Sequence, residues 1–155
     1  MAFQLPEDCD HRVHAIYDYW CGLRSGKRLP ARRDVDPADV PALLPYLWLT
    51  DVERDPPRFR FRLIGSAIVE GLGRDLTGRY FDQCFDNFDG SPPHRTLVEI
   101  SAKGRPAWRR GPALLTRKDY NVKEMERIIL PLASDGETVD LFLALSVYVL
   151  DDNRA

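Results

Sequence analysis

The C-terminal third of the chain contains two β-rich segments separated by a glycine-containing turn. The segments cover residues 124–133 and 138–149, and Asp135-Gly136 lies between them. This dipeptide readily supplies the positive φ angles of a tight hairpin turn. The second segment has apolar residues at alternate positions: Val139, Leu141, Leu143, Leu145, Val147 and Val149. A period of two is typical of a strand with one buried face. The pattern predicts a long antiparallel hairpin, so a β-sheet forms the core and offers the binding surface.

One residue inside this hairpin conflicts with regular strand pairing. Pro131 lies within the first β-rich segment. Proline has no backbone N–H and cannot donate to the hydrogen-bond ladder. We therefore expect the strand to be open or bulged at this position. We also expect the alternating apolar residues of the second segment to line the floor of any pocket.

Three further strands are predicted upstream. The pattern of residues 46–52 and 58–64 predicts a second hairpin, with the prolines confined to the loop at 53–57. Residues 106–115 predict another strand, with a bulge or bend near Gly111-Pro112. Arg58, Arg60 and Arg62 alternate with apolar residues, which indicates the solvent face of a strand.

The segments between these strands have helical patterns. They predict a helix at 13–23, short helical turns at 36–45, a helix at 67–72 ended by Gly73 and another at 92–103 ended by Gly104. The order of elements indicates an α+β fold: a five-stranded antiparallel sheet with helices over one face and an N-terminal helical extension. We expect the extension to cover residues 1–45 and the sheet domain to cover 46–150.

Composition and cysteine usage narrow the class of protein. A chain of 155 residues with 44% hydrophobic and 30% charged residues suits one ordinary globular domain. A net charge of −2 argues against nucleic acid or an anionic membrane as the main partner. Cys9, Cys21 and Cys84 form no C-x-x-C pair, which favours a reducing compartment. The first residues lack a signal-peptide pattern, and no apolar run approaches the ~20 residues of a membrane helix. We expect a cytoplasmic protein.

The predicted N-terminal helix carries an aromatic and aliphatic stripe. Val13, Ile16, Tyr17 and Trp20 recur at helical spacing. The stripe either packs on the sheet of its own chain or forms a self-association face. The second interpretation predicts a homodimer through the N-terminal helix.

The order and spacing of several segments resemble those of the PAS domain. They are 43–53, 59–65, 73–80 and 126–132, followed by Asp135-Gly136. The chain is similar, from about Tyr17 to Tyr148, to single-domain alphaproteobacterial PAS proteins with a helical N-terminal extension. The resemblance implies a sensory or interaction module rather than a catalyst. It also implies dimerisation through N-terminal helices, and a pocket between sheet and helices that in PAS domains holds haem, flavin, a small organic acid or nothing.

The residues do not favour haem, flavin or metal. His11 and His14 lie at the start of the first helix, and His94 lies in the first turn of another helix. None lies in the middle of a helix, in the region where the haem ligands of PAS domains occur. Cys84 lacks the flanking arginine and glutamine of the photoreactive flavin motif. The neighbouring Asp82 and Asp86 would disfavour a redox-active thiolate. No His or Cys spacing matches a metal site, so we predict no cofactor and no metal.

A small-ligand pocket remains, and two groups of residues are candidates for lining it. The apolar candidates, most of which could equally be plain core, are Phe61, Leu63, Ile68, Leu72, Trp108, Ile128, Leu143 and Leu145. The polar candidates are Arg74, Arg79, Tyr80 and Arg105. Arg79 suits a carboxylate, or alternatively a salt bridge to Asp75 or Asp82.

Three functional hypotheses follow. The first is a sensory or regulatory module that binds a small ligand or a protein partner and signals by a shift between two packings. The second is a small α+β enzyme of the isomerase or hydratase type, which a buried carboxylate facing the pocket would favour. The third is a structural dimerisation module without a pocket.

Overall fold

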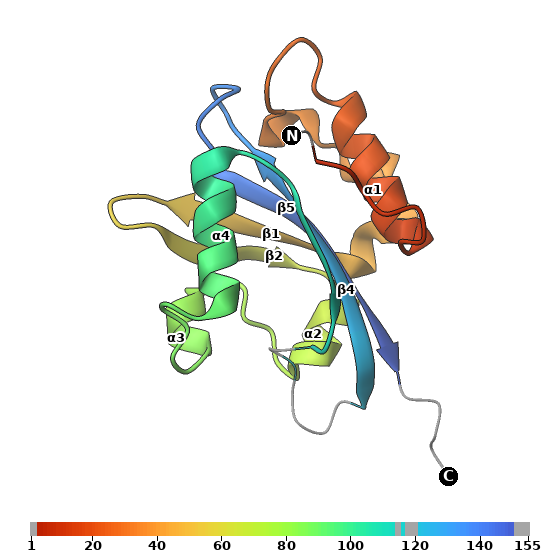
Figure 1. The fold of residues 1–155 in the computed structure, drawn as a ribbon, viewed down its shortest axis with the longest axis vertical. Helices are drawn as coiled ribbons and strands as arrows, with labels where there is room; N and C mark the ends of the chain where they lie inside the picture. Colours follow the sequence, from red (N-terminus) through yellow and green to blue (C-terminus); the bar gives the residue numbers. More distant parts are fainter. Residues whose placement is uncertain (1–2, 114–115, 117–120, 151–155) are drawn as a thin grey trace.

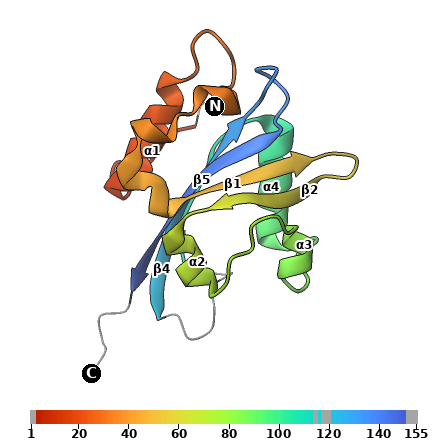
Figure 2. The same ribbon diagram turned by 180° about the vertical axis from the view of Figure 1, so that it is seen from behind.

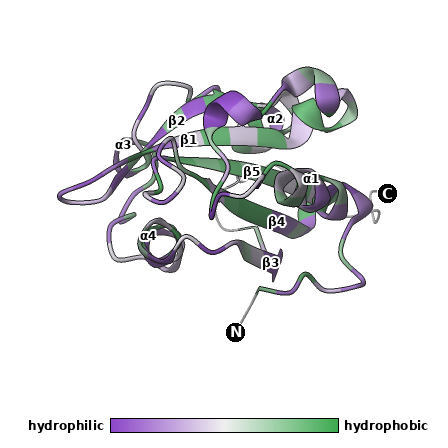
Figure 3. Cartoon of the chain, turned by 90° about the horizontal axis from the view of Figure 1, so that it is seen from above, coloured by the Kyte–Doolittle hydropathy of each residue, from purple (hydrophilic) through white to green (hydrophobic). Residues whose placement is uncertain are grey.

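The computed structural model describes residues 3–113, 116 and 121–150 of the chain. Its centre is a five-stranded antiparallel sheet, shown in Figure 1, with the strand order β2-β1-β5-β4-β3. The strands are β1 (Leu47–Glu53), β2 (Arg58–Ile64), β3 (Ala107–Gly111), β4 (Val122–Leu132) and β5 (Leu141–Leu150). The C-terminal hairpin β4–β5 therefore occupies the middle of the sheet. It is largely hydrophobic, as the green colouring in Figure 3 indicates.

Helices cover both faces of this sheet. The N-terminal helix α1 (His11–Gly22) packs against β4 and β5 from one side. On the other side lie α2 (Ser66–Leu72), α3 (Phe81–Cys84) and α4 (Pro92–Lys103); Figure 1 shows β4 and β5 passing between α1 and α4. Figure 2 shows α2 and α3 next to β2. Three short 3₁₀ helices connect α1 to β1: η1 (Arg32–Asp34), η2 (Pro37–Asp39) and η3 (Pro41–Tyr46).

The predicted fold class is confirmed. The five strands occur in the predicted order, β2 has the predicted bounds, and the N-terminal helix is present. The predicted strand at 106–115 is the shorter β3, and residues 114 and 115 lie outside the described residues. Helix α3 was not predicted from the sequence. It has only four residues and follows a glycine-rich connection.

Local signals in the sequence explain the ends of α4. The Ser91 hydroxyl accepts a hydrogen bond from the backbone N–H of His94, and Pro92 occupies the first helical position. Both features are favoured where backbone N–H groups have no helical partner. Gly104 ends the helix with φ of 65°, a left-handed conformation that costs glycine little.

The loop between β4 and β5 is longer than the predicted tight turn. Regular pairing ends at Leu132 opposite Leu141. Gly136 has φ of 83°. The Asp135 carboxylate accepts hydrogen bonds from the backbone N–H groups of Glu137 and Thr138. The aspartate and glycine act as predicted, but they close a loop of several residues.

The expectation of an open or bulged strand at Pro131 was wrong. Pro131 lies opposite Phe142 in an unbroken register, and the only irregularity in the described β4–β5 pairing lies between Val122 and Glu124. The Pro131 carbonyl accepts a hydrogen bond of 2.9 Å from the indole Nε1 of Trp20. In a strand, the carbonyl and the N–H position of one residue point to the same side. The carbonyl and the N–H position of Pro131 therefore both point away from β5. The last residue pair between β3 and β4 is Ala107–Ile129, so β3 does not pair with Pro131. The missing N–H removes no ladder bond.

Trp20→Phe tests this anchor between α1 and the sheet. The change keeps an aromatic ring but leaves the buried carbonyl of Pro131 without its donor, so we expect a loss of ~1–3 kcal/mol in unfolding free energy. Chemical denaturation measures it. The matched control is Tyr19→Phe, which removes exposed hydrogen bonds to Asp39 and to the backbone of Asp36 and should cost much less. Equal losses in the two variants would contradict the anchoring role.

Candidate ligand-binding pocket

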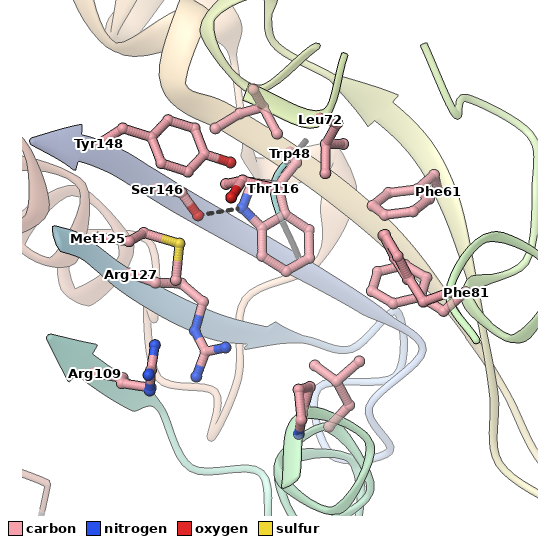
Figure 4. Close-up of a pocket in the computed structure, with 14 residues that line it drawn as sticks. Trp48, Phe61, Leu72, Phe81, Arg109, Thr116, Met125, Arg127, Ser146 and Tyr148 are labelled. Atoms are coloured by element: carbon pink, nitrogen blue, oxygen red, sulfur yellow. Dashed lines mark hydrogen bonds between the residues drawn. The ribbon is translucent and has the colours of Figure 1, made fainter. Parts of the chain in front are cut away.

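A cavity of about 80 Å³ lies between the sheet and the helices α2 to α4 (Figure 4). It has room for roughly five to eight water-sized groups. Every strand and helix around it contributes side chains. The apolar lining residues are Trp48, Phe61, Ile68, Leu72, Phe81, Phe85, Pro93, Leu97 and Met125, and the polar ones are Arg109, Thr116, Arg127, Ser146 and Tyr148. We call the side of the sheet that carries Trp48 and Arg127 the pocket face, and the side covered by α1 the α1 face.

The apolar part of the pocket is built from aromatic rings held by β1, β2 and α3. The rings of Phe61 and Phe81 stack with centroids 4.0 Å apart. The ring of Trp48 lies 6.4 Å from Phe61 and 6.2 Å from Phe81. Phe85 contacts both phenylalanines edge-on. Stacked and edge-to-face arrangements are the favoured geometries of aromatic pairs, so these contacts stabilise the wall around the cavity.

The polar part is built from a row of residues that crosses three strands. Arg109 of β3 lies directly opposite Arg127 of β4, and Arg127 lies directly opposite Ser146 of β5. Directly opposite residues project from the same face of a sheet. Figure 4 shows both guanidinium groups projecting from neighbouring strands on the pocket face. The row therefore places two cations and a hydroxyl at one end of an aromatic cavity.

The two arginines lack full pairing within the described part of the chain. Nη1 of Arg109 and Nε of Arg127 are buried and have no hydrogen-bond partner among the described residues. Burial, together with the positive charge of Arg109, lowers the pKa of Arg127 to about 10. The Arg127 guanidinium is still protonated at neutral pH. Among the described residues that line the pocket, the charged ones are the two arginines, and no carboxylate occurs.

Ser146 links the polar row to the aromatic wall. Its Oγ accepts a buried hydrogen bond of 3.0 Å from Nε1 of Trp48, drawn as a dashed line in Figure 4. The bond satisfies the indole donor and fixes the orientation of the tryptophan. A serine hydroxyl can donate one hydrogen bond while it accepts another. Ser146 can therefore donate to a group inside the cavity.

The structure places the predicted apolar candidates in three different environments. Phe61, Ile68 and Leu72 line the pocket. Leu63 lies outside it and is 47% exposed. The other four candidates alternate with pocket residues along their strands, so they project from the α1 face. They are Trp108, Ile128, Leu143 and Leu145. The apolar alternation of β5 therefore faces α1 and does not line this pocket, contrary to expectation. The pocket side of β5 carries Ser146 and Tyr148.

The predicted polar candidates do not line this pocket either. The guanidinium of Arg74 donates to the carbonyl of Cys84, and the Tyr80 hydroxyl donates to Glu53. For the side chain of Arg79, no ion pair occurs within the described residues. Instead, Arg58 pairs with Asp82, while Asp75 accepts hydrogen bonds from Thr77. Arg105 is exposed and lies beside a separate groove between α1 and the segment after α4.

The apolar stripe of α1 packs within its own chain. Val13, Ile16 and Trp20 are buried against the sheet. Tyr17 is partly buried and packs against Phe3 and Trp20. The stripe therefore packs on the sheet of its own chain. Three of its four residues are buried there and cannot contact a second copy of the chain.

Other reactive side chains lie outside the pocket. The described residues contain no group of three or more His, Cys, Asp or Glu that could hold a metal ion. The imidazole Nδ1 of His94 accepts a hydrogen bond from the backbone N–H of Gly90, and its ring packs against Phe59 and Phe88. Burial raises the pKa of the Cys84 thiol, despite the nearby charges of Arg79 and Arg74, which disfavours the thiolate.

Sequence reasoning missed the polar row of Arg109, Arg127 and Ser146. A signal was present, since Ser146 interrupts a mostly apolar strand and Arg127 directly precedes the apolar run at 128–133. The strands are central and buried on both faces, so the alternation alone did not identify which face carries the pocket. Recognising the interrupting polar residues would have required the register between β3, β4 and β5.

The strand order, the covering helices and the cavity between them are those of a PAS-type α+β fold. A family model described as "PAS domain" matches residues 10–147, and the chain belongs to the PAS domain family. Members of this family are typically sensory or regulatory modules. A solved structure titled "Structure of the PAS domain from Bordetella pertussis BvgS" is similar in fold, with a TM-score of 0.51. Sequence identity is 14%, over 74% of this chain and 84% of that one. No curated protein matches this chain.

Within the described residues, no helix combines the length and apolar character that a membrane span requires.

Proposed function

We propose that this PAS domain is a cytoplasmic sensory module that binds a small molecule in the cavity between the sheet and α2 to α4. The observation that carries the proposal is the cavity itself, with rigid aromatic walls and a few polar groups at one end. Apolar walls with few, well-placed polar groups are typical of small-molecule sites. The volume of about 80 Å³ suits a small metabolite and is too small for haem or flavin. The absorbance spectrum of the purified protein tests the prediction that it carries neither cofactor.

The strand β4 offers a route from the cavity to the N-terminal helix. Arg127 projects into the pocket, and its neighbour Glu126 projects from the α1 face, where it binds the backbone N–H of Asp10. Asp10 is the N-cap of α1. A ligand that moves β4 would therefore change the support of α1, and two packings of α1 would differ in their affinity for the ligand or a partner.

The alternative functions find less support. A carboxylate in the pocket would favour an isomerase or hydratase, and none occurs among the described lining residues. A pocketless structural module does not match the cavity. Homodimerisation through α1 stays a prediction. It would have to use the exposed side of the helix, and light scattering after size-exclusion chromatography tests it.

Filling the cavity tests the proposal. Leu72→Trp adds a large ring from the partly buried Leu72, which lines the pocket (Figure 4). We expect it to lower the affinity for benzoate, benzamide, hexanoate or hexanamide, whichever binds the wild type, by tenfold or more in isothermal titration calorimetry. Leu63→Trp is the matched control, because Leu63 is exposed and does not line the pocket. The proposal fails if none of these probes binds the wild type, or if both variants bind equally well.

A further inference from the structure

We infer that the ligand of this pocket is a small organic acid, whose carboxylate binds Arg109 and Arg127 and whose apolar body lies against Trp48, Phe61 and Phe81. This inference rests on the proposed function, because it names the chemical class of the ligand for the same cavity. It is carried by the geometry of the cationic end and by the pairing that the described residues leave unmet.

The first step concerns the charges. Two arginines directly opposite each other in neighbouring strands repel, and like charges in this relation destabilise a sheet. The described residues place other arginines of the sheet beside carboxylates: Arg58 binds Asp82, and both Arg60 and Arg62 bind Asp51. Arg110, the neighbour of Arg109, binds Asp8 and Glu126 on the opposite face. Arg109 and Arg127 have no such ion pair within the described residues.

The second step concerns the unmet hydrogen bonds. A buried donor without an acceptor costs free energy. Nη1 of Arg109 and Nε of Arg127 are both donors in this state among the described residues. Both side chains line the cavity, so their guanidinium groups can donate to an acceptor placed inside it. Guanidinium groups bind carboxylates in a forked geometry with two parallel hydrogen bonds. One carboxylate between them would reduce the repulsion and supply the missing acceptors.

The third step concerns the rest of the ligand. Beyond the arginines, the cavity is bounded mainly by the rings of Trp48, Phe61, Phe81 and Phe85. An inorganic anion would satisfy the arginines and leave this apolar space unfilled. An acid with a short aliphatic or aromatic body fills both ends. With room for roughly five to eight water-sized groups, the cavity favours acids of the size of hexanoate or benzoate.

The chemical class is tested with matched pairs of acid and amide. Benzoate is compared with benzamide and hexanoate with hexanamide, in calorimetry and thermal-shift assays, with sodium phosphate as the inorganic anion. We expect each acid to bind at least tenfold more tightly than its amide and than phosphate. Equal binding of acid and amide would overturn the inference and leave the proposed function standing. If neither binds, the proposed function itself fails. Tighter binding of phosphate than of the acids would assign the site to an inorganic anion and overturn the inference.

Arginine variants test the two residues directly. Arg127→Met removes a cation that lacks a partner, so we expect the ligand-free protein to melt about 3 °C higher while benzoate affinity falls at least tenfold. Arg109→Met should lower benzoate affinity similarly. Arg62→Met, which alters an exposed arginine of the same sheet, should leave affinity unchanged.

A gain in stability together with a loss of binding cannot result from misfolding. A destabilised Arg127→Met protein that keeps its affinity for benzoate would show that Arg127 is structural and overturn the inference.

Discussion

Replacing Gly65 with alanine is expected to lower the unfolding free energy by ~3 kcal/mol, the range of a severe overpacking, and the melting temperature by roughly 6–12 °C. Gly65 is the N-cap of α2, directly after β2. A β-carbon at this position would meet the backbone carbonyl oxygens of Pro45 and Leu44 at distances far below van der Waals contact. These are main-chain atoms of η3, so no side chain can turn away to relieve the contact.

The close approach at Gly65 has a structural role. Its backbone N–H donates a hydrogen bond of 2.7 Å to the carbonyl of Leu47, so the start of α2 is fixed to the start of β1. Moving the two backbones apart would weaken this bond and shift α2, which supplies Ile68 and Leu72 to the pocket. We therefore expect Gly65→Ala to weaken ligand binding as well as stability.

Gly22→Ala provides the control for Gly65→Ala. Gly22 is the last residue of α1, and a β-carbon there would have no neighbour within 4 Å. Because alanine favours a helix more than glycine does, the melting temperature should stay the same or rise slightly. Thermal unfolding followed by circular dichroism compares the two variants. A Gly65→Ala protein as stable as wild type would show that η3 and α2 can separate without cost.

The sequence contains enough information for the sheet but less for its two faces. Alternation in residues 138–149 and the turn at Asp135-Gly136 predicted β4 and β5, because a strand repeats every two residues whatever covers it. The same alternation could not tell which helices cover which face. Leu143 and Leu145 were expected in the pocket and instead face α1, because α1 supplies the apolar cover on their side.

The pocket shows the same limit at the level of single residues. Of the predicted candidates, Phe61, Ile68 and Leu72 line the cavity, and they belong to segments with one clear buried side. Arg109 and Arg127 were missed because their proximity depends on the register between β3 and β4. They are 18 positions apart in the chain, and no local pattern links them. Pairing across strands is a non-local property, so only the folded sheet reveals that the two cations share one end of the cavity.

On the α1 face, one buried carboxylate connects three separate parts of the chain. The Glu126 side chain accepts hydrogen bonds from the backbone N–H of Asp10, the indole Nε1 of Trp108 and the guanidinium of Arg110, at distances of 3.0–3.3 Å. It is only 5% exposed. The bonds join the N-terminal segment, β3 and β4, immediately behind Arg127.

Glu126→Ala is expected to lower the unfolding free energy by ~3 kcal/mol, because removing one partner of a buried ion pair leaves its donors unsatisfied. Arg110 is partly exposed and retains Asp8, which keeps the loss below that of a fully buried pair. We expect hydrogen exchange to become faster in residues 8–14, since the N-terminal segment loses its bond to β4. Chemical denaturation and hydrogen exchange with mass spectrometry measure the two effects.

Glu124→Ala separates the role of the buried carboxylate from a general loss of charge. Glu124 lies two positions earlier on the same strand, is partly exposed and reaches Arg110 at 3.9 Å. Exposed ion pairs contribute ~0–1 kcal/mol, so this variant should be nearly as stable as wild type. If β4 transmits ligand binding to α1, benzoate should slow exchange in residues 8–14 of wild type and Glu124→Ala, and not of Glu126→Ala. An equal response in all three would show that α1 senses the pocket by another route, or does not sense it.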